Sequence, residues 1–558
     1  MFPFSGKRQY ILLLFIVSIC YLLGLFLPLM NGDASHHANI ALHMYQHHNY
    51  VDLIDRGKDY LDKPHLLFWL AAASYHIFGV TPFAYKLPSL LFSIAGAWAT
   101  YKTGKRLYNA ETGKLAALIL VSSQAFILAC MDVRMDAILT ACIILASWQL
   151  LEATIAKKWY NAIAAALFMA LGFSTKGMAG IAIPCGALFF YLLYKRDFSQ
   201  LFHIKWVIVA LCTIVFMLPV LYCYYLQFDL HPEKEIRGMN HISGIQFILW
   251  GQNIERLEGE NWGGGKKDYF FYFHTLLWAF LPWALLAYYA AASRIKNLWV
   301  TKFAFAKNAE AFTIGTIVFV FILISASRFQ LPHYLNIIFP FLAVLTAAKL
   351  VELDDQHGYR KILNVISRLQ ISISLLMVIL IAVLYIWFFP VHIALVCTLA
   401  LAALLFICWC TFSRQKPLSK ITAVSVTGIA LVNIILNGFF YPQLLRYEGG
   451  LNLAKLSREK QIDPADVYYY NTYNFAFDFD TEHLAPTFSL EEIINKSGRA
   501  YWLLTDAPGL DSLKQSQVPV AETIESEHFH ITRLKLAFLN PATRPKTLDR
   551  LYLLKISP

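Results

Sequence analysis

Residues 10–33 have the sequence YILLLFIVSICYLLGLFLPLMNGD, and this stretch decides the fold. Its apolar part, 10–30, is long enough to cross a bilayer, which takes about 20 residues. Lys7-Arg8 precedes it, as in a signal peptide, but the apolar run is too long and no small-x-small cleavage site follows. We therefore expect an uncleaved first membrane span that ends just before Asp33.

The composition of the whole chain agrees with a membrane protein. Of its 558 residues, 58% are apolar and 15% are charged, whereas a soluble protein has about 25% charged residues. This excludes a disordered chain, a secreted disulfide scaffold and an ordinary soluble enzyme. The nine cysteines lie in or beside apolar segments, without metal-ligand spacing, and are expected to act as small apolar residues. The net charge of +11 falls largely in short loops, so the expected partner is a lipid bilayer and not nucleic acid.

Twelve further apolar stretches have the character of membrane spans. With 10–30 they make thirteen expected spans, the others being 83–101, 115–131, 137–156, 160–175, 178–194, 206–226, 269–292, 311–326, 335–350, 369–389, 391–412 and 421–441. If the N-terminus is cytoplasmic, every inner loop is basic, as the positive-inside rule requires. The odd number of spans then places the segment 442–558 on the outer side, in the periplasm or outside the cell.

The predicted fold is an all-α polytopic membrane domain, 1–441, followed by a small soluble α/β domain, 442–558. Within the second domain, the patterns predict strands at 466–471, 500–504, 530–538 and 551–556. They predict helices at 451–460 and after Ser489, where Glu492 completes a capping box.

Two outer segments are expected to form the walls of a site, 31–82 and 227–268. In the first, 34–48 is predicted to be a helix in the membrane interface, with apolar residues such as Ile40 and Met44 on one side and histidines on the other. The second is polar and is typical of a mobile loop over a site.

Ionisable residues gather on the outer side at the ends of the spans. The acidic ones are Asp33, Asp62, Asp132 and Asp136, and the basic ones are Lys63, Lys176, Arg256 and Arg328. Several cations beside a carboxylate at one membrane face fit an anionic lipid headgroup. The cations can bind phosphate through charge-assisted hydrogen bonds, and a carboxylate can act as a general base or bind a metal.

Simpler interpretations of the same residues remain open at this stage. Asp33 could be a helix-end carboxylate in water, and Asp136 could cap the helix that it begins. Basic residues at helix ends often extend to the membrane surface without binding anything. His43 and His47 could share a metal with Asp33, Asp62 or Asp136, but a polar interfacial face accounts for these histidines equally well. The only cofactor considered is therefore a divalent metal.

The order of these motifs resembles a known family. Asp33-x-x-His36 and Tyr60-Leu61-Asp62-Lys63-Pro64, with Trp69 close behind, are similar to the first outer loop of GT-C membrane glycosyltransferases, in particular the aminoarabinose-transferase-like (ArnT-like) branch related to protein O-mannosyltransferases. Further similar motifs are Arg134-x-Asp136, Thr175-Lys176-Gly177, Pro282-Trp283 and Ser327-Arg328-x-x-Leu331-Pro332-x-Tyr334.

The resemblance implies a monosaccharide donor linked to a polyprenyl phosphate, and a lipid (such as lipid A), glycan or protein acceptor, at the outer face of a bacterial inner membrane. It implies that Asp33 is the catalytic carboxylate and Asp136 its partner. The residues that it implies for the donor phosphate are Lys63, Lys176, Arg256, Arg328 and His36, and those for the substrate are Asp62, Trp69 and Tyr334.

The chain also departs from the family pattern at two places. His36 occupies the position of the usual arginine, so a phosphate contact there would depend on pH or be absent. The loop 250–256 lacks the histidine that helps to bind zinc in some members, which puts a bound metal in doubt.

The alternative function is a transporter or flippase of a lipid-linked or anionic substrate. Transporters tend to place charges near the midplane of the bilayer, in repeated halves. The expected spans here are largely free of charge at their centres and no twofold repeat is evident. The sequence therefore favours the glycosyltransferase.

Overall fold

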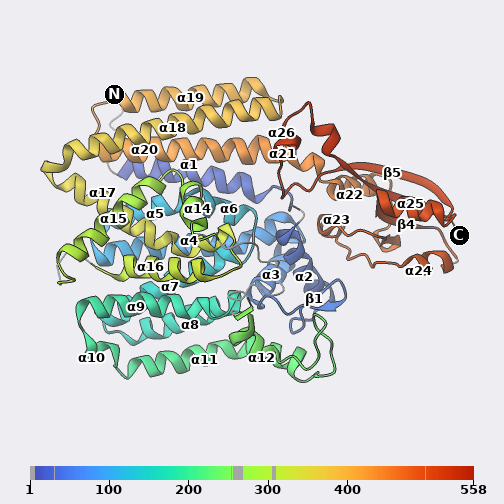
Figure 1. Cartoon of the computed structure of the whole chain (residues 1–558), viewed down its shortest axis with the longest axis horizontal. Coiled ribbons are helices and arrows are strands. Elements are labelled where there is room, and N and C mark those ends of the chain that lie inside the picture. The colour runs from blue at the N-terminus through green and yellow to red at the C-terminus, as the bar shows by residue number, and fades with distance from the viewer. Residues whose placement is uncertain are drawn as a thin grey trace.

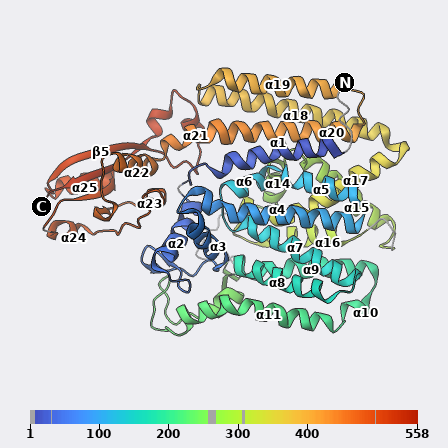
Figure 2. The ribbon, with the colours of Figure 1, turned by 180° about the vertical axis from the view of Figure 1, so that it is seen from behind.

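The structure is a computed structural model that describes residues 7–30, 32–252, 254–255, 268–304, 310–496 and 498–557. Long helices pack side by side into a body, and a small sheet with its own helices projects from one end (Figure 1). The predicted fold class, a polytopic helical membrane protein with a small α/β part at the C-terminus, is confirmed. We call the end of the body that carries α2, α3 and the sheet the site end, and the opposite end the far end; the view from behind shows the same two ends (Figure 2).

The helices of the body follow the apolar stretches of the sequence. They are α1 (Lys7–Leu25), α2 (Asp33–His47), α3 (Leu66–Phe78), α4 (Pro82–Leu107), α5 (Ala110–Val121), α6 (Gln124–Met131), α7 (Asp136–Ile155), α8 (Trp159–Lys176), α9 (Ala179–Lys195), α11 (Lys205–Tyr224), α14 (Phe271–Ala279), α15 (Ala284–Val300), α16 (Phe312–Ala326), η3 (Pro332–Ile338), α17 (Phe339–Asp355), α18 (Arg360–Phe388), α19 (Ile393–Phe412) and α20 (Pro417–Ile435).

Seven of the described helical segments are long and apolar enough to cross a membrane, and the pair α5–α6, bent by 56°, would be an eighth. Each of the thirteen expected spans overlaps a helix, but the count of thirteen stays a prediction. The single span expected at 269–292 is wrong, because the chain there forms two helices, α14 and α15, with a turn between them. Pro282 lies in that turn, where it has no N–H to continue a helix.

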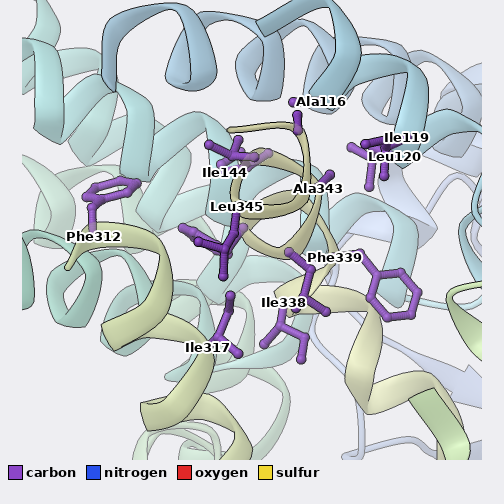
Figure 3. Packing of buried hydrophobic residues seen from close by; sticks show 14 of the residues in the cluster. Ala116, Ile119, Leu120, Ile144, Phe312, Ile317, Ile338, Phe339, Ala343 and Leu345 are labelled. Carbon is purple, nitrogen blue, oxygen red and sulfur yellow. The ribbon is translucent and has the colours of Figure 1, made fainter. Parts of the chain in front are cut away.

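The core of the body is made by helices that are buried nearly all round. Side chains of α17 such as Ala343 and Leu345 pack against α5, α7 and α16 (Figure 3). A helix that is apolar on every side belongs in such a position. The outer helices α18 and α19 instead leave most of their surface exposed, as lipid-facing helices do.

A buried lysine fixes the chain just before Asp33. Lys86 on α4 is 1% exposed, and its Nζ donates to the carbonyl oxygens of Gly24 (2.9 Å) and Leu27 (2.6 Å). These carbonyls lie at the C-terminal end of α1, where helical partners are lacking. The bonds therefore tie the end of α1 to α4, a few residues before α2 begins.

The helix α2 is present as predicted, and most of its residues are buried within the protein. Its residues Ala34, Ala38 and Ala41 are buried, and it packs between α3 and α23 (Phe475–Thr481) of the C-terminal part. His37 is buried as well, so the expected separation of histidines onto one exposed face is wrong.

The C-terminal part contains a four-stranded sheet in the order β3-β4-β6-β5. Its strands are β3 (Val467–Tyr469), β4 (Tyr501–Asp506), β5 (Val520–His528) and β6 (Asp549–Ile556), and its helices are α22 (Gly449–Glu459), α23, α24 (Leu490–Asn495), α25 (Ala507–Gln515) and α26 (Leu536–Leu539). β3 pairs parallel to β4, and the other pairs are antiparallel. The capping box of Ser489 and Glu492 is formed.

The predicted strand at 530–538 is wrong, and the fourth strand is β5. The segment 530–538 is apolar because Ile531 and Phe538 pack on the ends of the membrane helices, in a cluster with Phe389 and Phe440. β5 was missed because it is an edge strand with exposed glutamates, so it lacks a clear apolar alternation.

Glu448 begins the C-terminal part and is fully buried. Its Oε1 accepts hydrogen bonds from Asn474 Nδ2 (2.7 Å) and the N–H of Gly450 (3.4 Å). Burial raises the pKa of this carboxyl to about 7, from an ordinary value of 4.5. The folded protein therefore binds this proton more tightly than the unfolded chain does.

We expect this proton to make the stability of the protein depend on pH. The stabilisation is complete below about pH 4.5 and is lost as the pH rises through about 7. Glu448→Gln should remove this loss and raise the melting temperature at pH 8 above that of the wild type. Differential scanning fluorimetry at pH 4.5 and at pH 8 tests this. The control is Glu491→Gln, at an exposed carboxylate of α24. The same pH-dependent loss in Glu448→Gln as in the wild type would contradict it.

Candidate functional site

The candidate residues come from four elements that meet at the site end of the body. Asp33 is the first residue of α2, Asp136 is the first of α7, and Lys176 is the last of α8. The turn between α6 and α7 adds Asp132 and Arg134, and η3 adds His333 and Tyr334. Segments separated by up to 300 residues of sequence thus form one polar cluster.

Arg134 joins three members of this cluster. Its guanidinium lies 3.6 Å from Asp33 Oδ2 and 3.1 Å from Asp132 Oδ2, and its Nη1 is 3.1 Å from His333 Nδ1. An arginine can only donate, so His333 Nδ1 must accept and the ring proton of neutral His333 must be on Nε2. That nitrogen faces Asp136 Oδ2 at 3.7 Å.

Asp136 is held in a buried ion pair. Its Oδ1 is 2.8 Å from Lys176 Nζ, and the two side chains are only 5% and 10% exposed. Lys176 also lies over the ring of Tyr334, 4.4 Å from the centroid. The pair links α7 to α8, and a carboxylate so enclosed is poorly placed to accept a proton from a substrate.

Asp33 has the opposite environment. Its side chain is 58% exposed, and the nearby Arg134 leaves it accessible. Of the two carboxylates implied as catalytic, Asp33 is the one that an incoming molecule can reach. Asp136 instead orients Lys176 and His333.

The charge of Lys63 acts on His37, a buried residue of α2. Burial, with the positive charges of His36, Lys63 and Arg134, holds the pKa of His37 well below its usual value. His37 is therefore neutral at pH 7, and Lys63 contributes to a positive potential beside it. Lys63 and Asp62 lie on the segment that leads into α3.

Asp62 is paired with a cation from the second outer segment. Its carboxylate contacts the guanidinium of Arg237, which also lies 3.0 Å from Glu255 Oε2. The carbonyl of Asp62 accepts a hydrogen bond from Gln252 Nε2. These contacts fasten the first outer segment to the segment that begins at 227.

His36 is engaged with Asp55 instead of standing free for a phosphate. Its Nε2 lies 3.1 Å from Asp55 Oδ2. Burial alone would raise the pKa of Asp55, but the contact with His36 and the charge of Arg56 lower it below its ordinary value. Arg56 in turn lies over the rings of Tyr473 and Phe475 in the C-terminal part.

The residues considered for a metal do not come together. His43 and His47 stack on each other with centroids 4.0 Å apart, whereas Asp62 and Asp136 are paired with cations. Within the described ranges, no group of three or more His, Cys, Asp or Glu side chains is arranged to hold a metal ion.

The three remaining candidates are not among the contacts of the polar cluster described above. Trp69 Nε1 donates to the carbonyl of Tyr50 (2.7 Å), which stabilises the loop before α3. Arg328 is exposed in the bend between α16 and η3. Arg256 and much of the loop expected around it lie outside the described residues.

A cavity of about 420 Å³ lies beside the polar cluster. Asp132, Arg134, Asp136 and His333 form its polar wall, and Met30, Leu128 and Trp278 are among its apolar lining. The C-terminal part closes one side through Ile531, Thr532 and Leu534. A molecule with both charged and apolar portions fits such a space.

Sequence reasoning missed His333 and underestimated Arg134 and Asp132. Both His333 and Arg134 lie inside motifs singled out for other residues, next to Tyr334 and two residues before Asp136. Asp132 was given no role of its own, but it pairs with Arg134. The available signal was their position beside candidate residues, His333 next to Tyr334 and Arg134 close to Asp136.

Comparisons with known proteins agree with the fold and the motifs. Residues 62–223 match the family model described as dolichyl-phosphate-mannose-protein mannosyltransferase. The undecaprenyl phosphate-alpha-4-amino-4-deoxy-L-arabinose arabinosyl transferase of Wigglesworthia glossinidia brevipalpis is 24% identical over 78% of this chain and 75% of its own length. The undecaprenyl phosphate-alpha-4-amino-4-deoxy-L-arabinose arabinosyl transferase 1 of Pseudomonas fluorescens is 24% identical over 50% of this chain and 46% of its own length. The aligned regions thus cover about half to three quarters of these relatives.

Solved structures show the same fold over nearly the whole chain. ArnT from Cupriavidus metallidurans bound to undecaprenyl phosphate aligns with a TM-score of 0.72 and 17% identity, covering 98% of both chains. The apo form aligns with a TM-score of 0.73 over 98% of this chain and 97% of the other. The resemblance to the ArnT-like GT-C proteins is therefore confirmed.

The buried ion pair predicts a measurable coupling between Lys176 and Asp136. Lys176→Met leaves the Asp136 carboxylate buried without its closest cation, which should cost about 3 kcal/mol of stability. Adding Asp136→Asn should recover most of this loss, because the unpaired charge is removed. Melting of the single and double variants forms a double-mutant cycle. If the stability losses of the two single variants simply add up in the double variant, the two side chains are not coupled and the ion pair is contradicted.

Proposed function

We propose that this protein is an integral-membrane glycosyltransferase that moves a hexose or pentose from a polyprenyl-phosphate donor to a lipid, glycan or protein acceptor. The observation that carries the proposal is the exposed carboxylate of Asp33 beside Arg134, a residue that lines a largely apolar cavity in an ArnT-like fold. The names of the curated relatives and the undecaprenyl phosphate in the ArnT complex support this donor class.

The chemistry needs a base for the acceptor and a positive site for the leaving group. The acceptor attacks the anomeric carbon of the sugar with its hydroxyl oxygen or its amine nitrogen. Asp33 accepts the proton that this oxygen or nitrogen loses. The bond between this carbon and the phosphate oxygen breaks, and negative charge grows on the phosphate. Lys63, Arg134 and Lys176 stabilise that charge because they are already in position. Arg256, which lies outside the described residues, is proposed as a further cation for the phosphate.

The remaining candidates have supporting roles in the proposal. Arg328 is proposed as a further contact of the donor phosphate and Tyr334 as a contact of the sugar beside Lys176, whereas His36 is engaged with Asp55. Asp62 and Trp69 shape the first outer segment through their own contacts.

The protein is a polytopic membrane protein, and we propose a bacterial inner membrane as its location. In this orientation the N-terminus is cytoplasmic and the site end, with the domain 442–558, faces the periplasm. The basic loops at the far end support the orientation through the positive-inside rule.

Asp33→Asn should abolish sugar transfer while the protein remains folded. An amide cannot accept the proton, so the rate should fall by about 100-fold or more. The measurement is release of polyprenyl phosphate from a polyprenyl-phosphate sugar by purified protein in liposomes with a membrane extract as acceptor source. Glu235→Gln, at an exposed carboxylate of the second outer segment, is the control. Turnover by Asp33→Asn at the wild-type rate would contradict the role.

Lys63→Ala should weaken binding of the donor by about tenfold or more, because it removes one charged partner of the phosphate. The affinity is measured with polyprenyl phosphate itself, by microscale thermophoresis in detergent. Lys58→Ala, at an exposed lysine of the same outer segment, should leave the affinity unchanged. Equal affinities of Lys63→Ala and the wild type would remove Lys63 from the phosphate site.

A further inference from the structure

A second cavity lies between α1 and α4, away from the polar cluster. We call it the α1–α4 groove, and its volume is about 650 Å³. One wall is a single face of α1, with residues three or four positions apart, and the other is the facing side of α4. The lining includes Leu14, Ser18 and Leu22 from α1 and Leu90, Ile94 and Ala97 from α4.

The dimensions of the groove fit one extended hydrocarbon chain. It runs from Tyr10 to Leu22 along α1, which is about 18 Å at 1.5 Å per residue. The hydrocarbon core of a bilayer is about 30 Å thick, so the groove spans just over half of it. Leu22, Ile94 and Trp98 are 53%, 58% and 48% exposed, and the groove is therefore open to lipid.

The far end of the groove is polar and basic. Tyr10, Tyr101 and the exposed Lys114 line it there. Lys7 and Arg8 precede Tyr10 within one turn of α1, and Lys105 follows Tyr101 by one turn of α4; all three are exposed. Glu111, one turn before Lys114 on α5, offsets part of this charge. The four basic side chains outnumber the one carboxylate, so this end of the groove favours binding of a negatively charged group.

The groove lies against the helix that leads into the candidate site. α1 is attached to the body by hydrogen bonds such as Tyr21 Oη to the carbonyl of Val121 (2.9 Å), and Lys86 holds its other end before Asp33. A molecule in the groove would fill the space between α1 and α4 and so stabilise the position of α1.

We propose that the α1–α4 groove binds one acyl chain of an anionic phospholipid, with the lipid phosphate at Lys114. This lipid belongs to the leaflet at the far end, opposite the leaflet that the candidate site faces. The site is distinct from the cavity beside Asp136 and does not depend on the proposed function.

Native mass spectrometry tests the proposal on the full-length protein. Delipidated protein is mixed with equal amounts of phosphatidylglycerol and phosphatidylcholine that carry the same acyl chains. We expect the wild type to retain one phosphatidylglycerol molecule in preference to phosphatidylcholine. Lys114→Glu should reduce this retention by about tenfold, because basic side chains near the surface attract anionic lipid. Lys296→Glu, at an exposed lysine of α15 near the far end, is the matched control.

Two substitutions test the groove itself. Ala97→Trp fills it from α4 and Ser18→Trp fills it from α1, and each should reduce the retention of both lipids. Equal retention of the two lipids by the wild type, or an unchanged preference in Lys114→Glu, would overturn the headgroup assignment. Unchanged retention in both tryptophan variants would overturn the groove. Lys114→Glu changes an exposed residue, so the test stays decisive even if a tryptophan variant does not fold.

Discussion

Charges at the edge of an apolar membrane bundle must be paired, and the rest of the site depends on how this pairing is arranged. The ion pair of Asp136 and Lys176, at 2.8 Å, fixes the start of α7 to the end of α8. Arg134, in the preceding turn, then reaches His333 on η3 and Asp33 on α2. Leaving one of these charges buried and unpaired would cost several kcal/mol, so each partner fixes the position of the next.

The arrangement separates two carboxylates that look alike in the sequence. Asp136 is buried in an ion pair with Lys176, whereas Asp33 remains exposed beside Arg134. Lys86 secures the end of α1 before Asp33, and the C-terminal part covers α2 from the other side. The segment 531–534 closes the cavity wall. The site is therefore shared between the membrane helices and the domain that follows them.

Much of the fold could be predicted, because membrane burial and strand alternation leave direct patterns in the sequence. The apolar stretches became helices, and three of the four strands lay where expected. The segment 530–538 misled because its apolar residues pack on another part of the chain. Contacts such as the hydrogen bond from Arg134 to His333 arise only when segments distant in sequence meet. Sequence motifs therefore indicated a candidate site, and only the fold showed which of its charges are paired and which remain accessible.

We propose that the cations beside Asp33, among them Arg134 and Lys176, bind the phosphate of a polyprenyl-linked sugar. The most direct measurement is an experimental structure of the protein in a lipid nanodisc with undecaprenyl phosphate. We expect the phosphate within hydrogen-bonding distance of Lys63 or Lys176, with the prenyl chain leaving toward the membrane. A phosphate bound elsewhere, with the cluster of charges facing no part of the lipid, would contradict it.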